Sequence, residues 1–137
     1  MSVYYATKEQ VAAKLFSIFQ AVSQLKFVDR QYIEPGNYAY PGLFINDVRE
    51  ARDSRLKDVV LVTWSVLLVL YVYDDSATLS TTLNAEIKRL IDALKADVTL
   101  GGLTYNARVL QVDTDEGFLR PHGVALLTTE LVLLSQS

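Results

Sequence analysis

The sequence predicts an α+β protein: a mainly antiparallel, twisted sheet with two main helices packed on one face, in the order α-β-β-β-α-β-β. Two segments, 7–25 and 78–96, carry apolar residues at helical spacing. Between them, residues 59–73 form a long run rich in β-branched and aromatic side chains, which favour strands. Two more strand-like segments, about 103–113 and 123–134, close the chain.

Composition limits the possible functions. The 137 residues predict one domain, 1–137, and 50% hydrophobic with 21% charged residues is typical of a globular protein. The chain has no cysteine and one histidine, which excludes disulfides, thiolate metal sites, a cysteine nucleophile and any site that needs two imidazoles. A net charge of -3 argues against a general nucleic-acid binder.

The sequence also predicts no targeting or membrane segment. The opening MSVYYATKEQ lacks the basic and apolar regions of a signal peptide, so we expect synthesis in a cytoplasm. The apolar run 59–73 would span only about 22 Å as a helix, against roughly 30 Å for the hydrocarbon core of a bilayer. Its composition indicates a strand instead.

The first helix has a clear start. Thr7 to Gln10 fits a capping box, in which the threonine hydroxyl and the glutamine amide satisfy early backbone groups. The apolar stripe that follows has alternating spacings of four and three residues and consists of Val11, Leu15, Ile18, Val22 and Leu25. An amphipathic helix over 7–25 is expected.

Short elements follow this helix. Residues 27–33 alternate only weakly, residues 34–37 (EPGN) indicate a turn, and Tyr40-Pro41-Gly42 indicates a second break. Residues 43–45 are then expected to form a short strand.

Residues 46–58 are the most polar stretch of the chain. Four basic and four acidic residues alternate along it: Arg49, Arg52, Arg55 and Lys57 with Asp47, Glu50, Asp53 and Asp58. We expect an exposed loop or arm outside the core. The three arginines recur every third residue, which could place them on one side of a helical turn as a phosphate-binding stripe. Because the acidic residues cancel the local charge, a solvated or inter-subunit ion-pair arm is the favoured interpretation.

The strand 59–73 is long for so small a domain. Fifteen residues extend for roughly 50 Å, whereas the radius of gyration expected for this length is about 14 Å. The strand must therefore contain a bulge or project from the body. It is apolar on both faces, so if helices cover one face, a neighbouring subunit is the simplest cover for the other.

The rest of the chain closes the sheet. The helix 78–96 ends at residues 97–102, where Gly101 and Gly102 favour a tight turn. The two closing strands are joined by the acidic connector 114–122.

No catalytic or cofactor motif is present. The sequence contains no G-x-S-x-G, G-x-G-x-x-G or P-loop. Asp113 to Gly117 fails as a calcium loop, because the glycine falls at the fifth position and Val124 occupies the twelfth. Asp74-Asp75 is interpreted as the start of a helix rather than a carboxylate pair for acid–base chemistry. His122, beside Pro121 and Gly123, is interpreted as a surface-loop histidine.

Several strings, in this order of elements, resemble the tail terminator (tail completion) proteins of tailed bacteriophages. They are the opening amphipathic helix, Tyr40 to Ile45, the polar arm, the long strand ending at Leu70 to Asp75, the next helix, Asp97 to Gly102, and a closing hairpin that ends in Leu131 to Leu134. The likeness covers nearly the whole chain. Two features depart from the family pattern: the arm is unusually charged, and the final strand lacks a terminal aromatic residue.

The resemblance implies a non-enzymatic virion protein that forms a ring, a hexamer, on the head-proximal end of the tail tube. Such a ring ends tube polymerisation and offers a joining surface to the head-side connector or neck protein, while DNA passes through without specific binding. The implied protein has no catalytic residue, cofactor, metal or membrane contact. It is located in the virion tail and assembled in the host cytoplasm. Another neck or head-completion protein, or a small α+β ligand-binding domain or enzyme with a site around His122, remains the alternative.

Two candidate surfaces follow for such a ring. The arm residues Arg49, Arg52, Arg55 and Lys57 are the candidate subunit interface, because their charges can pair with a neighbour. The acidic residues Asp113, Asp115 and Glu116 are the candidate lumen or rim, where like charge keeps DNA mobile; a solvated loop on the outside of the ring is the alternative.

Overall fold

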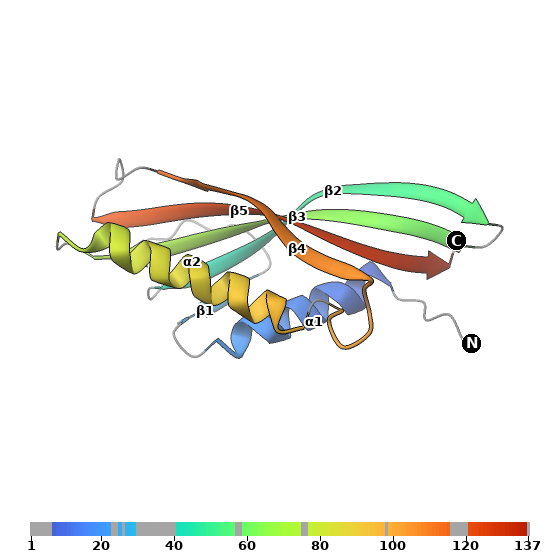
Figure 1. The fold of residues 1–137 in the computed structure, drawn as a ribbon, viewed down its shortest axis with the longest axis horizontal. Helices are drawn as coiled ribbons and strands as arrows, with labels where there is room; N and C mark the ends of the chain where they lie inside the picture. The colour runs from blue at the N-terminus through green and yellow to red at the C-terminus, as the bar shows by residue number, and fades with distance from the viewer. Residues whose placement is uncertain are drawn as a thin grey trace.

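A computed structural model describes residues 7–22, 25, 27–29, 41–56, 59–74, 77–97, 99–115 and 121–136. Its elements are α1 (Lys8–Gln20), β1 (Phe27–Asp29), β2 (Gly42–Leu56), β3 (Val59–Tyr73), α2 (Leu79–Lys95), β4 (Asn106–Thr114) and β5 (His122–Gln136). One sheet has the order β1-β2-β3-β5-β4, parallel only between β1 and β2. Both helices lie on the same side of the sheet, which confirms the predicted α+β fold (Figure 1).

The core lies between this sheet face and the helices. Alternate residues of β3 from Val60 to Val72 are all buried on the helix side. Trp64 lies in the middle of the row and is 2% exposed. From α2, the stripe Leu83, Ile87 and Leu90 belongs to the same cluster, as the helical spacing predicts.

The first helix is shorter than predicted. Its capping box is present: the Thr7 N–H donates to Gln10 Oε1 at 2.8 Å, and the Gln10 N–H donates to Thr7 Oγ1 at 3.2 Å. The helix ends at Gln20 rather than residue 25. Two turns follow, in which the N–H of Val22 bonds to Phe19 and that of Leu25 to Val22. Leu25 still packs on the core, so the apolar spacing predicted its burial correctly. The spacing did not predict that the helix ends before it.

The polar segment 46–58, expected as an exposed loop or arm, forms a strand over its described residues 46–56, and the side chains of 47–53 are exposed. Residues 43–45 are only the beginning of β2, which pairs with β3 from Gly42 to Leu56. The charged residues tolerate a strand here because β1 pairs with β2 only at Gly42–Phe44. Further along, no strand of the described chain lies on the outer side of β2, and charged side chains are common on such edge strands.

The far half of the sheet projects from the body, as the length of β3 predicts. Figure 1 shows β2, β3 and β5 continuing well past the helices. The pairing of β3 with β5 is continuous from Val59 to Tyr73, so β3 itself is not interrupted. Irregularities occur instead in β2, between Asp47 and Arg49 and between Ser54 and Leu56, and in β4 between Val109 and Gln111.

The connection after α2 is a tight turn, as predicted. Leu100, Gly101 and Gly102 have φ values of 48°, 70° and 92°. The Gly101 N–H donates to Asp97 Oδ1 at 3.1 Å, which holds the turn against the helix end. Because the turn continues to Leu103, β4 begins at Asn106 rather than at 103. The predicted turn at 34–37 lies outside the described residues.

Candidate subunit interface

The sheet has two unlike edges. At one edge, the outer side of β2 beyond Phe44 has no strand beside it within the described ranges. At the opposite edge, β4 pairs with β5 and has no second partner strand among the described residues. An edge strand offers backbone N–H and C=O groups to another chain, so both edges are candidate contact surfaces.

The β2 edge carries the predicted interface residues, but not on one side. Arg49 lies opposite Ser65, on the helix-free face, whereas Arg52 lies opposite Val62, on the helix side. The disfavoured alternative, a phosphate-binding stripe on one side of a helical turn, therefore does not hold for Arg49 and Arg52, because side chains three apart in a strand point to opposite faces. Arg52 lies 3.7 Å from Glu50 in an ion pair on its own face. The side chain of Arg55 and the whole of Lys57 lie outside the described residues.

An irregularity beside Trp64 sets which charged residues face which way. The register shifts between Asp47 and Arg49 and leaves Val48 61% exposed. At this point the Trp64 Nε1–H donates to Asp47 Oδ1 at 2.7 Å. The bond anchors the base of the projecting hairpin in the core.

The β4 edge exposes apolar side chains, which the sequence interpretation missed. Tyr105, Leu110 and Val112 are 59%, 49% and 38% exposed. Leu110 is the extra residue at the register shift in β4. It therefore interrupts the alternation of apolar and polar residues by which a half-exposed strand is recognised in a sequence. A groove of about 460 Å³ lies between α2 and β4, where Ile91, Leu94 and Lys95 face β4.

The helix-free face of the sheet is partly covered at one end. Phe44, Val69 and Tyr71 form a second buried cluster there, with Phe44 and Tyr71 in an edge-to-face contact at 5.7 Å. Farther along β3, Leu61 and Leu67 are half-buried. Leu126 on β5 is 36% exposed. The apolar character of both faces of β3, expected from the sequence, is thus real.

The acidic connector begins at the same edge. Asp113 belongs to β4 and accepts a hydrogen bond from Gln111 Nε2 at 2.7 Å. The backbone N–H of Asp115 donates to Val124 O at 3.1 Å, which closes the end of the ladder. Glu116 lies outside the described residues. A lumen or rim position for these residues stays a prediction.

His122 is not in a loop, which corrects the sequence interpretation. It is the first residue of β5, opposite Tyr73, and the two rings meet edge to face at 5.2 Å. This contact is aromatic packing, which needs no catalytic explanation.

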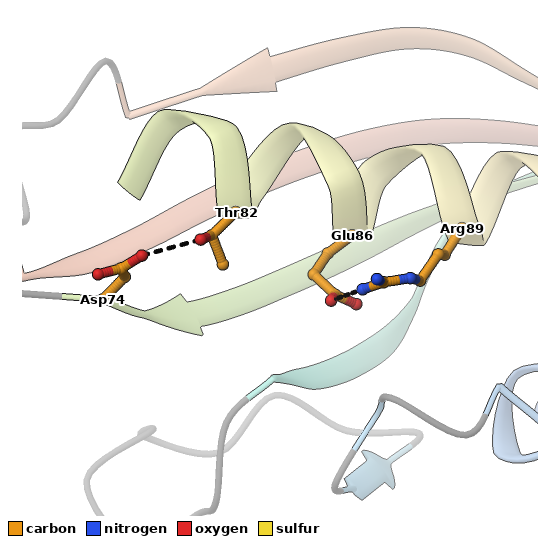
Figure 2. A network of polar contacts seen from close by, with 4 residues as sticks. All are labelled: Asp74, Thr82, Glu86 and Arg89. Carbon is orange, nitrogen blue, oxygen red and sulfur yellow. Dashed lines mark hydrogen bonds and ion pairs between the residues drawn. The ribbon is translucent and has the colours of Figure 1, made fainter. Parts of the chain in front are cut away.

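The carboxylates near α2 organise the helix. Figure 2 shows Asp74 reaching Thr82 and Glu86 reaching Arg89. Asp74 Oδ2 accepts from Thr78 Oγ1 at 2.9 Å and from Thr82 Oγ1 at 2.8 Å, as expected of an acidic residue at a helix start. Glu86 is 5% exposed and pairs with Arg89 through one oxygen, while its Oε2 has no partner among the described residues.

Among the described residues, no group of three or more histidine or acidic residues is placed to hold a metal ion. No helix there is long and apolar enough to cross a membrane.

Comparison with solved structures shows similar folds, of which one belongs to a virion particle. A chain in the virion of a native gene transfer agent (GTA) particle superposes with a TM-score of 0.61 and 11% sequence identity, over 96% of this chain and 100% of that chain. The two chains share a fold. At this identity the match is evidence for the fold alone. No protein-family model matches the sequence, and no curated protein matches it.

Proposed function

We propose that this protein is a structural component of a phage-like virion and acts there as a tail terminator. In this role it forms a ring on the head-proximal end of the tail tube, ends tube polymerisation and provides the surface that joins head to tail. The observation that supports the proposal best is the end-to-end similarity of fold to a chain of a gene transfer agent virion.

The shape of the subunit supports a role in assembly. A ring needs two different contact surfaces on each copy, because head-to-tail contacts close by rotation. The β2 edge, which is mostly charged, and the β4 edge, which exposes both apolar and charged side chains, are such a pair. In this proposal the protein is not an enzyme and carries no cofactor.

The proposed partners follow from this position in the virion. The ring, a hexamer, contacts the tail tube protein on one face and the head-side connector or neck protein on the other. DNA passes through it without specific binding. Asp113, Asp115 and Glu116 line the lumen or its rim, where carboxylates that are not paired with a basic residue of a neighbouring copy repel the phosphates of passing DNA and so avoid the affinity that Lys or Arg contacts would add.

A capping assay tests the function. Tube protein polymerising in vitro should stop growing when this protein is added, and electron microscopy should show a ring on one end of each tube. The Lys88→Glu variant, altered on the exposed face of α2 where Lys88 pairs with Asp92, is the matched control and should cap equally well. Tubes that keep growing in the presence of an intact ring would contradict the terminator role. A ring that binds the connector but not the tube would identify a head-completion protein instead.

A further inference from the structure

We propose that copies of this chain join edge to edge, with β4 of one copy pairing antiparallel to β2 of the next in one register. Two ion pairs fix that register: Arg49 of the next copy with Asp113, and Asp53 of the next copy with Arg108. The inference deepens the ring proposed above by naming the surfaces and the alignment through which it closes.

The strand directions allow this pairing. Each strand from β2 through β3 and β5 to β4 is antiparallel to its neighbour, so β4 runs opposite to β2. A second copy placed beside β4 in the same orientation therefore presents its β2 antiparallel to β4. The helix sides of both sheets then face the same way, and one continuous sheet results.

The spacing of the charges matches on the two edges. Arg49 and Asp53 lie opposite Ser65 and Leu61, four positions apart on the helix-free face. Arg108 and Asp113 lie opposite Glu130 and Leu126, also four positions apart on that face, because the irregularity at Leu110 absorbs the extra residue. When the two edges pair antiparallel, Arg49 of the next copy therefore lies opposite Asp113, and Asp53 of the next copy lies opposite Arg108.

The present contacts of these side chains are compatible with the pairing. Arg49 is exposed and has no ion-pair partner among the described residues. Arg108 is exposed, and its ion pair with Glu130 spans 3.4 Å. Asp113 accepts a hydrogen bond from Gln111 of the same strand. Asp53 already has a polar contact in its own chain, but a carboxylate can accept several donors.

Other groups supply the affinity. Such ion pairs set orientation more than strength, whereas backbone hydrogen bonds between the edges and buried apolar surface stabilise the contact. In this register Arg52 of the next copy faces Val109 and Glu50 faces Val112, on the helix side. The aliphatic stem of Arg52 then covers the groove between α2 and β4, and the exposed parts of Leu110 and Val112 lose solvent contact.

The register also has the stagger that a closed barrel requires. Within one chain Arg49, Ser65, Glu130 and Arg108 lie in one row across four strands. Pairing Arg49 of the next copy with Asp113 shifts that copy by four residues for every four strands. The shift is thus one residue, about 3.3 Å along the strand, for each lateral step of about 4.8 Å to the next strand. This ratio corresponds to a strand tilt of roughly 35° from the barrel axis, within the range of closed barrels.

The direction of the stagger indicates which face lies inside. The β3–α2–β4 connection is a crossover between parallel strands, and such connections are right-handed. When the sheet is viewed from its helix side with β4 pointing up, β4 is therefore the right-hand edge. The next copy then lies to the right of β4, and the stagger moves it upward by four residues. Strands that climb to the right as seen from outside fit the right-handed strand twist of barrels, so the helices lie outside and the helix-free face lines the lumen.

Cysteine pairing tests the register, because the chain contains no cysteine of its own. In this register Ala51 of one copy lies opposite Gln111 of the next. Oxidised Ala51→Cys/Gln111→Cys protein should give a ladder of linked chains on non-reducing gels, up to the full ring. Within one chain the two positions are three strand spacings and four residues apart, roughly 20 Å, too far for a disulfide. Each single-cysteine variant should give no ladder.

A second cysteine pair separates this register from the unstaggered one. Asn106 lies on the same face of β4 and in the same row as Ala51 of its own chain. The Ala51→Cys/Asn106→Cys protein should not form a ladder. A ladder from this variant instead of the first would overturn the proposed register.

Charge exchange tests the two ion pairs. Arg49→Glu should raise the protein concentration at which half the rings dissociate by at least tenfold in low salt, measured by native mass spectrometry. Adding Asp113→Arg to the same chain should restore it to within about threefold, because the pair is rebuilt with opposite signs. Lys88→Glu should leave it unchanged.

The outcomes distinguish the register from the ring itself. Intact rings without a Gln111 ladder and without rescue would refute the edge pairing while leaving the proposed function standing. A ladder that grows into open chains without closing would refute the ring and support the edge pairing. A chain that stays monomeric and gives no ladder would refute both.

Discussion

Replacing Asp47 with alanine should weaken the protein at the base of the projecting hairpin. The Asp47 carboxylate accepts the Trp64 Nε1–H at 2.7 Å, and the tryptophan is 2% exposed. After Asp47→Ala the indole N–H remains buried without this acceptor. The exposed carboxylate, by contrast, can be solvated by water when the indole is removed.

The expected loss is about 2 kcal/mol in the free energy of unfolding. A hydrogen bond to a charged group contributes about 1.5–3 kcal/mol, and an unsatisfied buried donor costs about 1–3 kcal/mol. For a domain of this size the melting temperature should fall by roughly 6–8 °C. Asp47→Asn keeps an oxygen acceptor at the same position and should lose less than about 1 kcal/mol.

A double-mutant cycle isolates this bond from the other contacts of both residues. Urea unfolding of the wild type, Asp47→Ala, Trp64→Phe and the double variant, followed by circular dichroism, gives a coupling free energy. We expect about 1–2 kcal/mol, since Asp47→Ala should cost little once the indole N–H is gone. In the wild type, fluorescence of the single tryptophan should report the same transition.

Additive losses would refute the reasoning. A coupling below about 0.3 kcal/mol would mean that the Trp64–Asp47 bond does not hold the strand irregularity, and that the faces occupied by Arg49 and Arg52 are set by other contacts.

Three other changes have defined outcomes. Gly123→Ala should destabilise the fold by about 1–3 kcal/mol in urea unfolding, because the added Cβ would lie 2.9 Å from Val72 Cγ2; unchanged stability would mean that the Val72 side chain shifts easily. Reversing Arg52 and Arg55 to Glu should weaken the ring or make it more salt-sensitive in native mass spectrometry, and equal assembly at low and high salt would exclude the arm from the interface. His122→Ala should leave folding and virion assembly intact, whereas lost infectivity in a well-folded variant would reopen a site at this residue.

The fold could be predicted largely because burial leaves periodic signals in the sequence. The long apolar run gave β3 with the bounds Val59–Tyr73, and the stripe from Leu79 to Leu94 gave α2. The strand character of 46–56 could not be predicted in the same way. Those residues are held by backbone hydrogen bonds to β3, and backbone bonding leaves no hydrophobic pattern when both side-chain faces are exposed.

The candidate interface was predicted only in part, for a related reason. The charge of the arm pointed to an interface, but the side on which each arginine lies depends on one strand irregularity after Asp47. The sequence interpretation did not identify β4 as an edge strand, because the order of strands in the sheet decides which strand lies at an edge. Nothing in residues 106–114 indicates that β5, the last strand in the chain, inserts between β3 and β4.

The charges on the two edges also disfavour alignments that would prevent closure. An unstaggered pairing brings Arg49 of one copy opposite Arg108 of the next, because these residues share a row, and like charges at this distance repel. A shift of two residues towards the unstaggered alignment leaves Arg49 opposite Gln111 and Asp53 opposite Asn106, with neither ion pair formed. A shift of one residue sends every side chain of the edge to the wrong face. Only the four-residue stagger brings both basic residues to acidic partners, and that stagger also gives the strand tilt of a closed barrel. The charged hairpin can therefore keep the exposed edge from indiscriminate strand pairing in the monomer and still select a single register when the ring assembles.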